Sequence, residues 1–220
     1  MRVYHFLEEK WAIEDLRNRR LKVSRLYELN DPFEFMCYDL PTAAHRAAFR
    51  YMKEQFGRRL GLLCFSRNWK NPVLWSHYAE KHTGICLGFD ADDVVPVTYT
   101  AGRPHFAGKL SDLTDDFTGR WLSTKFKGWE YEDEVRTLVP LHEANEQSGL
   151  HYRSFGPHLQ LKQVIVGPLC AVTAGLQRAI GRHAAEIDIL KARLAFRSFG
   201  VTRDKHRFWN REHIRIPRLI

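Results

Sequence analysis

Hydrophobic positions repeat with a period of two in some segments and of three to four in others, which predicts both strands and helices. Short apolar or alternating runs predict strands at residues 2–6, 21–26, 61–66, 84–90, 94–100, 161–168 and 192–201. Helical spacing predicts helices at residues 10–20, 41–55, 71–82, 112–126 and 171–185. Because strand and helix do not alternate regularly, the expected class is α+β, with mixed, mainly antiparallel sheets and flanking helices.

Single residues add two details to this prediction. In the first predicted helix, the spacing of Trp11, Ile13 and Leu16 indicates the face that turns inward. The NDP tripeptide that begins at Asn30 predicts a turn, because Asn and Asp hydrogen-bond to their own backbone and Pro fixes φ.

The composition is typical of a folded domain: 220 residues, of which 44% are hydrophobic and 27% charged. No repeat or linker divides the sequence, so we expect a single domain over residues 1–220. The longest apolar runs fall far short of a membrane span, and MRVYHFLEEKW has acidic residues where a signal peptide would stay apolar. We therefore expect a cytoplasmic protein with no membrane partner. The four cysteines form no CxxC pair, which predicts reduced thiols.

The net charge of +8 is concentrated toward the C-terminus, where nearly every charged residue after Asp188 is basic. A basic segment can hold a polyanion such as nucleic acid, or the phosphates of a nucleotide. A solvated basic surface has the same composition. Nucleic acid is therefore one expected partner, through the basic C-terminal third.

The stretch KGWEYEDEVRTLVP at residues 127–140 alternates charged with aromatic and aliphatic residues. In a strand, Glu130, Glu132, Glu134 and Arg136 would share one face. An exposed edge strand with a solvated acidic face gives the same pattern. Adjacent carboxylates repel, however, so a cation, a ligand hydroxyl or the guanidinium would have to compensate them, which favours a functional face.

The predicted helix NPVLWSHYAEKH carries Trp75, Tyr78 and His82 on one stripe. Aromatic residues at helical spacing are most often core, and Trp75 fits that interpretation. A zinc site of His77, His82 and Cys86 is disfavoured, because the two histidines are five apart and point in different directions. No metal site is expected.

Several blocks in the first two-thirds of the chain resemble a large bacterial family of unknown function. In order they are YHF, LNDPFE, LCFS, LWSHYAEKHTGICLGF and KxWxYEDEVR, and the family is recognised by NDPFE, WSHYA-H-G and W-x-x-E-x-E-x-R blocks. More distantly, the layout is similar to ADP-ribosyltransferases, in which an early strand carries His or Arg and a later strand or loop carries an ExE pair. The GxGxxG, GxxxxGKS/T and GxSxG motifs are absent, which argues against Rossmann, P-loop and α/β-hydrolase enzymes.

The resemblance implies an ADP-ribosyltransferase-like fold and an enzyme that consumes NAD, as a transferase or an NAD glycohydrolase. By this resemblance, the carboxylate of Glu134 would stabilise an oxocarbenium-like ribose. Glu132 would orient or deprotonate the acceptor, and Arg136 would position both carboxylates. The residues assigned to NAD binding are His5, Asn30, Ser66, Trp75, Tyr78 and His82. The acceptor stays open between nucleic acid, protein and water. A toxin or anti-phage effector is implied, with an antitoxin or a neighbouring defence protein as partner.

Two other classes stay open. One is a non-catalytic nucleic-acid-binding module in which aromatic residues among the C-terminal basic ones stack on bases. These aromatics are Phe196, Phe199, Phe208 and Trp209, and packing in the core of the last strand is their alternative role. The other class is a metal-dependent nuclease that uses Glu132, Glu134 and Asp31, against which the lack of an ExK or DxD spacing counts.

Overall fold

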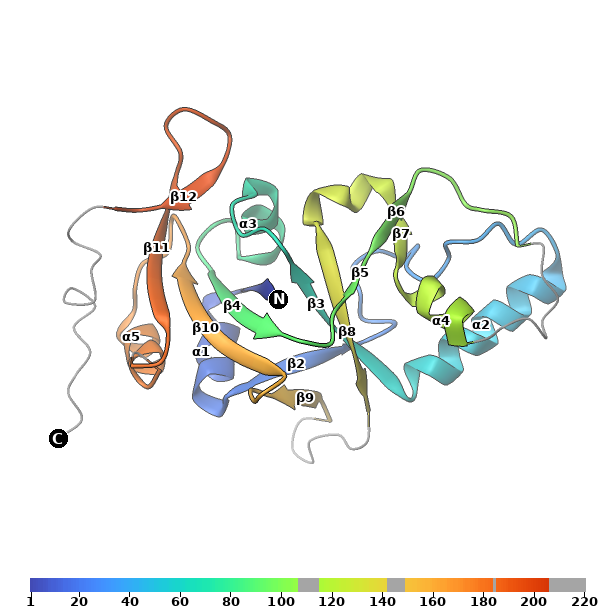
Figure 1. The fold of residues 1–220 in the computed structure, drawn as a ribbon, viewed down its shortest axis with the longest axis horizontal. Helices are drawn as coiled ribbons and strands as arrows, with labels where there is room; N and C mark the ends of the chain where they lie inside the picture. The colour runs from blue at the N-terminus through green and yellow to red at the C-terminus, as the bar shows by residue number, and fades with distance from the viewer. Residues whose placement is uncertain (107–114, 142–148, 184, 206–220) are drawn as a thin grey trace. The chain divides into compact units, whose positions relative to one another are not determined.

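The computed structural model describes residues 1–106, 115–141, 149–183 and 185–205 and is drawn in Figure 1. These residues form two compact units. Unit 1 takes in Met1–Leu21, Phe65–Asp92 and the described part of Ser154–Ile220, and unit 2 takes in Lys22–Cys64 and Asp93–Arg153. Helices and strands are mixed and the strands pair mainly antiparallel, which confirms the predicted α+β class. The expectation of a single domain stays a prediction.

The strands of unit 1 pair in the order β12, β11, β10, β4, β1. In that order their bounds are Val201–Arg203, Asp188–Leu194, Leu159–Val166, Ile85–Ala91 and Arg2–Leu7. β4 is antiparallel to both β1 and β10, whereas β10 and β11 run parallel. A parallel pair needs a crossover connection, and helix α5 (Ala174–Gly181) lies in the connection between β10 and β11.

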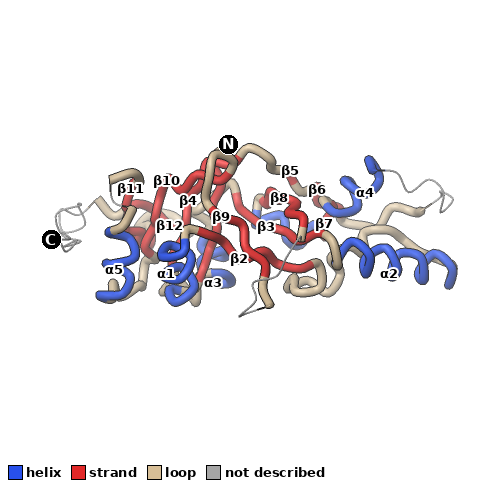
Figure 2. The backbone as a smooth tube through the Cα atoms, turned by 90° about the horizontal axis from the view of Figure 1, so that it is seen from below, coloured by secondary structure: helices blue, strands red, loops and turns tan. Residues whose placement is uncertain are grey.

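The helices of unit 1 lie on one side of its strands, as Figure 2 shows for α1 (Glu9–Asn18), α3 (Pro72–Tyr78) and α5. α1 turns Leu16 inward, as predicted, together with Asp15. The prediction that Trp11 faces inward is wrong, since its side chain is 49% exposed. The buried face of α1 follows the neighbouring helix α5, against which it packs, and Trp11 falls outside that face.

Burial of Asp15 makes the stability of unit 1 depend on pH. Burial, and secondarily the charge of Glu14, raises the pKa of Asp15 to about 7 from 3.8. The folded chain therefore keeps a proton that the unfolded chain releases near pH 4, so stability falls as pH rises from about 4 to 7. Asp15→Asn should remove this loss and raise the free energy of unfolding at pH 8 by on the order of 2–4 kcal/mol.

Urea denaturation at pH 5 and pH 8 measures this difference. Glu186→Gln is the matched control, because the Glu186 side chain belongs to the same unit and is 68% exposed, so this substitution should change neither value by more than about 0.5 kcal/mol. Parallel pH dependences for Asp15→Asn and the wild-type chain would contradict the assignment.

The described part of unit 2 contains helices α2 (Ala43–Gly57) and α4 (Asp115–Leu122) and a second group of strands. The strands are β2 (Arg20–Arg25), β3 (Leu60–Ser66), β5 (Val95–Pro96), β6 (Thr98–Thr100), β7 (Thr124–Phe126), β8 (Glu134–Pro140) and β9 (His151–Ser154). β8 pairs with β3 and β5, β2 pairs with β3 and β9, and β6 runs parallel to β7.

An aromatic core holds unit 2 together. Trp121 of α4 is fully buried and packs on Phe35 and Phe49, with ring centroids 5.5 and 6.3 Å apart. Its indole Nε1 also donates a hydrogen bond of 2.8 Å to the carbonyl oxygen of Phe35. The segment around Phe35, which belongs to the NDPFEF block, is thereby fixed against α4.

The predicted helix over residues 71–82 is shorter than expected, because α3 ends at Tyr78. Residues 80–82 all adopt left-handed backbone conformations, with φ of 47°, 53° and 75°. Such conformations are unfavourable for residues with a Cβ, and hydrogen bonds hold this turn: the His82 N–H donates to the Trp75 carbonyl at 3.0 Å, and the distant Leu169 N–H donates to the His82 carbonyl at 3.0 Å. A Cβ at Gly84 would lie 2.2 Å from a backbone oxygen, so only glycine fits there. The predicted helical stripe therefore does not include His82.

The stretch that was predicted as one strand over residues 127–140 is also divided. A 3₁₀ helix covers Lys127–Glu132, Asp133 is left-handed with φ of 46°, and β8 begins only at Glu134. Glu130 therefore does not share a strand face with the later carboxylates. Alternation is a local pattern, and here the buried ion pair between Glu132 and Lys125, at 2.6 Å, favours a compact turn instead.

Two other boundaries differ from the prediction. The helix expected at residues 112–126 is α4 followed by strand β7, and residues 112–114 lie outside the described part. The strand expected at residues 192–201 is a hairpin of β11 and β12, because the chain turns back between Leu194 and Val201.

Candidate functional site

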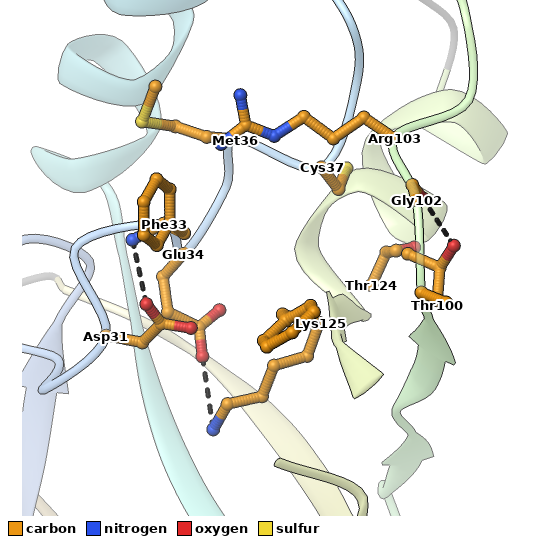
Figure 3. A pocket seen from close by; sticks show the side chains of 12 residues that line it. Asp31, Phe33, Glu34, Met36, Cys37, Thr100, Gly102, Arg103, Thr124 and Lys125 are labelled. Atoms are coloured by element: carbon orange, nitrogen blue, oxygen red, sulfur yellow. Dashed lines mark hydrogen bonds and ion pairs between the residues drawn. The ribbon is translucent and has the colours of Figure 1, made fainter. Parts of the chain in front are cut away.

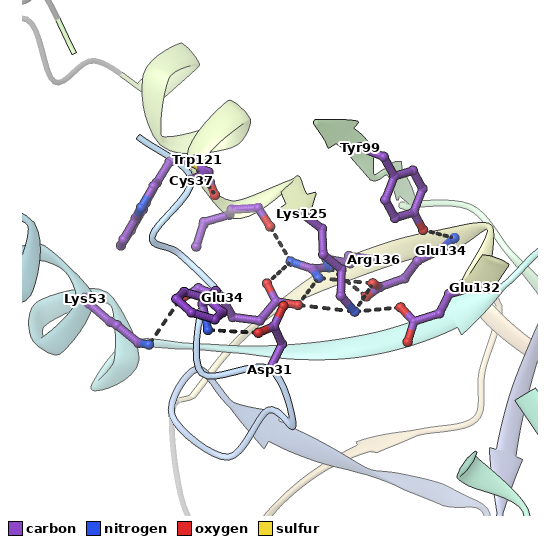
Figure 4. Close-up of polar contacts among 12 residues, drawn as sticks. Asp31, Glu34, Cys37, Lys53, Tyr99, Trp121, Lys125, Glu132, Glu134 and Arg136 are labelled. Carbon is purple, nitrogen blue, oxygen red and sulfur yellow. Dashed lines mark hydrogen bonds and ion pairs between the residues drawn. The ribbon is translucent and has the colours of Figure 1, made fainter. Parts of the chain in front are cut away.

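Five charged side chains are buried together in unit 2, and we call them the charge cluster: Glu34, Lys125, Glu132, Glu134 and Arg136 (Figure 4). Each is between 1% and 5% exposed. They come from four places in the sequence, namely the NDPFEF block, strand β7, the 3₁₀ helix and strand β8. Charges are buried at this density only when each has partners.

The ammonium of Lys125 lies between three carboxylates. Its Nζ is 2.6 Å from Glu132 Oε2, 3.0 Å from Glu134 Oε2 and 3.3 Å from Glu34 Oε1. The side chain is 4% exposed, so solvent hardly screens these contacts. The centre at which the carboxylates converge is thus occupied by a lysine.

The guanidinium of Arg136 joins two of the same carboxylates. It contacts Glu134 through Nε at 2.7 Å and Nη2 at 3.1 Å, and Glu34 through Nη2 at 2.7 Å and Nη1 at 3.2 Å. Nη1 also donates to the carbonyl oxygen of Leu122 at 2.8 Å. Two nitrogens of one planar guanidinium fix the orientation of a carboxylate as well as balance its charge. The ammonium of a lysine could not fix that orientation.

These contacts keep Glu134 and Lys125 ionised. Burial alone would raise the pKa of Glu134, but Arg136 and then Lys125 outweigh it and lower the pKa to about 2. Burial alone would lower the pKa of Lys125, and the carboxylates around it outweigh that effect and raise it. Three carboxylates against two cations leave the cluster with one formal negative charge.

A cavity of about 280 Å³ in unit 2 borders the cluster (Figure 3). Glu34 and Lys125 line it, together with a further carboxylate, Asp31. Its walls include Phe33 and Phe126, which are 57% and 55% exposed. The cavity thus combines acidic groups with two accessible aromatic rings.

The NDPFE block builds one side of this cavity by folding as a turn. Asp31 Oδ1 accepts a hydrogen bond of 2.9 Å from the Phe33 N–H, and the Glu34 N–H donates to the Asp31 carbonyl at 3.0 Å. The predicted turn is confirmed, and it brings both carboxylates of the block to the cavity. Asn30, which was assigned to NAD binding, is exposed and does not line the cavity.

The structure brings together the three residues that were assigned to catalysis. Glu132, Glu134 and Arg136 all belong to the charge cluster, and Lys125 links the two carboxylates. Their side chains do not line the cavity, because the oxygens of Glu134 are occupied by the two cations. Their role in catalysis stays a prediction.

The remaining residues assigned to NAD lie in unit 1. His5 of β1 packs edge-on against Phe65, with ring centroids 5.6 Å apart, and the Ser66 hydroxyl hydrogen-bonds to the backbone of Asn68. Trp75 is fully buried, so its burial supports the core interpretation rather than stacking on a ligand. Their assignment to NAD stays a prediction.

Tyr78 and His82, like His5, are assigned residues of unit 1 that remain partly accessible. The Nδ1 atom of His82 is buried without a hydrogen-bond partner, and burial lowers the pKa of this imidazole. Tyr78 contacts the ring of His77 edge-on, at 6.0 Å.

Sequence reasoning missed two residues that define this site. Glu34 was visible as the last residue of NDPFE, but in that block only Asn30, for NAD, and Asp31, for the alternative metal-dependent nuclease, were assigned to a site. Lys125 had no recognisable signal, because a single lysine in KFKGW is indistinguishable from a surface residue until its partners are known. Among the described residues, no group of His, Cys, Asp and Glu is arranged to hold a metal ion.

Comparison of the chain with protein-family models, with curated proteins and with solved structures found no significant match. Within the described part of the chain, no helix is both long and apolar enough to cross a membrane. The fold and the site are therefore the basis for a functional proposal. They define an α+β protein with a buried, net-negative ion-pair cluster beside an open aromatic cavity.

Proposed function

We propose that this chain is an NAD-consuming enzyme of the ADP-ribosyltransferase type, acting as a transferase or an NAD glycohydrolase. The observation that carries the proposal is the ionised charge cluster, with its one net negative charge, on the wall of a cavity lined by exposed aromatic rings. The resemblance of the EYEDEVR stretch to an ExE block agrees with it, since Glu132 and Glu134 are the cluster's two neighbouring carboxylates.

The chemistry of the cavity suits cleavage of the nicotinamide–ribose bond. As that bond breaks, positive charge builds on the ribose, and carboxylates held in fixed positions stabilise it. Glu134 stays ionised at every physiological pH, because its pKa is lowered to about 2. Asp31 and Glu34 supply the negative groups that border the cavity, and Glu134 holds Lys125 and Arg136 behind them.

The cavity walls suit the rest of the ligand. Phe33 and Phe126 offer faces on which nicotinamide can stack, and Arg103, whose guanidinium lies 5.2 Å from the Phe33 ring, can pair with a phosphate. A volume of about 280 Å³ corresponds to a nucleoside-sized fragment, below the size of a whole dinucleotide. The acceptor is nucleic acid, protein or water.

The test is release of nicotinamide from NAD by the full chain, with single-stranded DNA, RNA, protein or water as acceptor. We expect turnover with at least one of these acceptors. Phe126→Ala should raise the KM for NAD by about tenfold, because a stacking face is lost. Tyr51→Ala is the matched control: Tyr51 is 64% exposed in unit 2 and does not line the cavity, so KM should not change.

Circular dichroism of both variants should match that of the wild-type chain, because both rings are on the surface. No nicotinamide release with any acceptor, from a correctly folded protein, would refute the proposal. Equal KM values for the two variants would move NAD binding away from this cavity.

A further inference from the structure

The hairpin of β11 and β12 ends in a loop that presents two bare phenyl rings. Phe196 is 90% exposed and Phe199 is 104% exposed. For these two residues the interpretation as core of the last strand is therefore wrong. Phe208 and Trp209, for which the same role was considered, lie outside the described residues. The loop is closed at its base by a 2.9 Å hydrogen bond from the Ala195 N–H to the Gly200 carbonyl, and Figure 1 shows it extending beyond the paired strands.

The charge around these rings is positive. No acidic residue occurs between positions 189 and 203. The guanidinium of Arg193 lies 4.5 Å from the centroid of the Phe196 ring, in cation–π contact. Arg197 and Arg203 are exposed. The acidic residues nearest in sequence, Asp188 at the start of β11 and Asp204 just after β12, lie at the ends of the two strands away from the loop, so the two accessible rings have cations as their nearest charged neighbours in the hairpin.

A groove of about 710 Å³ lies beside the loop, within unit 1. Phe199 and Ser198 line it on the hairpin side, and Asn68 and Lys70 line it on the other side. The Val201 N–H donates to the Lys70 carbonyl at 2.8 Å, so the hairpin is attached to that segment. Phe199 therefore lines a concavity that also carries polar side chains and one cation, Lys70.

We propose that this hairpin loop and groove bind single-stranded nucleic acid. Bases stack on Phe196 and Phe199, and phosphates pair with Arg193, Arg197 and the cations beside the groove. Single-strand binders combine a positive groove with aromatic platforms in this way. The proposal concerns a surface of unit 1 that shares no lining residue with the cavity of unit 2, and it stands whether or not the chain consumes NAD.

The surface suits a single strand better than the other candidate partners. The bases of a duplex are already stacked inside it and cannot reach the rings. A second copy of the chain would bring the same arginines opposite each other, and like charges repel. A bilayer could accept the rings and the arginines, but it has no hydrogen-bonding groups to fill a groove lined by Asn68 and Ser198.

Fluorescence anisotropy of labelled 12-nucleotide oligo(dT) and oligo(U), in 0.1 M salt and without NAD, tests the proposal. The double variant Phe196→Ala/Phe199→Ala should weaken binding at least about tenfold. Arg197→Ala should lower the slope of log K against log salt by about 0.7, as expected for one lost phosphate contact. Leu169→Ala and Arg182→Ala are matched controls from exposed positions of the same unit and should bind like the wild-type chain.

Three outcomes would overturn the proposal: no oligonucleotide binding by the wild-type chain, equal binding by the double variant, or duplex DNA binding as tightly as the single strand. Two parallel measurements identify the other partners. If the phenylalanine substitutions leave oligonucleotide binding unchanged but abolish binding to vesicles of phosphatidylserine and phosphatidylcholine, the loop binds a membrane instead. If they leave oligonucleotide binding unchanged but abolish self-association in sedimentation, the loop binds a second copy of the chain. Because NAD is absent, failure here leaves the nicotinamide assay unaffected.

Discussion

Replacement of Arg136 by methionine should lower the free energy of unfolding by about 3–5 kcal/mol. Methionine keeps much of the volume but leaves Glu34 and Glu134 buried with Lys125 as their shared cation. Two carboxylates that are at most 4% exposed then repel each other without a guanidinium between them. Urea or guanidinium denaturation at pH 7 measures the change directly.

Arg58→Met is the matched control for this substitution. Arg58 also contacts a glutamate, Glu54 at 2.5 Å, but both side chains are more than half exposed. Solvent screens such a pair, and its loss should change stability by less than about 0.5 kcal/mol. If Arg136→Met and Arg58→Met destabilise equally, the buried cluster is not what holds this part of unit 2.

Acid provides a second readout of the same cluster. The pKa of Glu134 is lowered in the folded chain to about 2 from 4.5, so its contribution to stability is present above about pH 4.5 and is lost as pH falls toward 2. Arg136→Met removes the main cause of that lowering, so the variant should lose less stability between pH 5 and pH 3 than the wild-type chain does.

Glu134→Gln should lower kcat for nicotinamide release by about 10²-fold or more, with a smaller change in KM. Glutamine keeps the shape of the side chain but removes its charge, so the cluster becomes formally neutral. The electrostatic stabilisation of the ribose cation is then lost, and Lys125 is held less firmly beside Glu34. Initial rates over a range of NAD concentrations separate kcat from KM.

Glu134→Gln also removes two buried ion pairs, so a loss of activity has to be separated from a loss of fold. Circular dichroism and a denaturation curve establish the temperature at which the variant is folded, and rates are compared there. Glu54→Gln, on the surface of the same unit, is the control and should keep wild-type kcat. A folded Glu134→Gln with kcat within about twofold of wild type would rule out an electrostatic role for this carboxylate.

How far the sequence predicts the fold depends on the range of the interactions. Strands such as β1, β3 and β4 and helices such as α1 and α5 occur where hydrophobic periodicity places them, because that pattern follows from burying one face of a regular element. The boundaries of α3 and β8 do not. The turn at residues 80–82 is held by a hydrogen bond from the distant Leu169 N–H to the His82 carbonyl, and β8 begins only after the turn that the ion pair between Glu132 and Lys125 favours. At these points tertiary contacts override the secondary-structure propensity of the local sequence.

The site shows the same division. The sequence alone determined an α+β chain and the turn at NDPFE, and it drew attention to Glu132, Glu134 and Arg136 as charges that need partners. Only the tertiary structure decided what those partners are: Lys125 and Glu34 come from strand β7 and from the NDPFE turn. The energy of a buried charge depends on distances of about 3 Å between residues far apart in sequence, and no local pattern encodes them. For the same reason Phe196 and Phe199 read as core residues in the sequence, whereas the chain reversal between β11 and β12 exposes them.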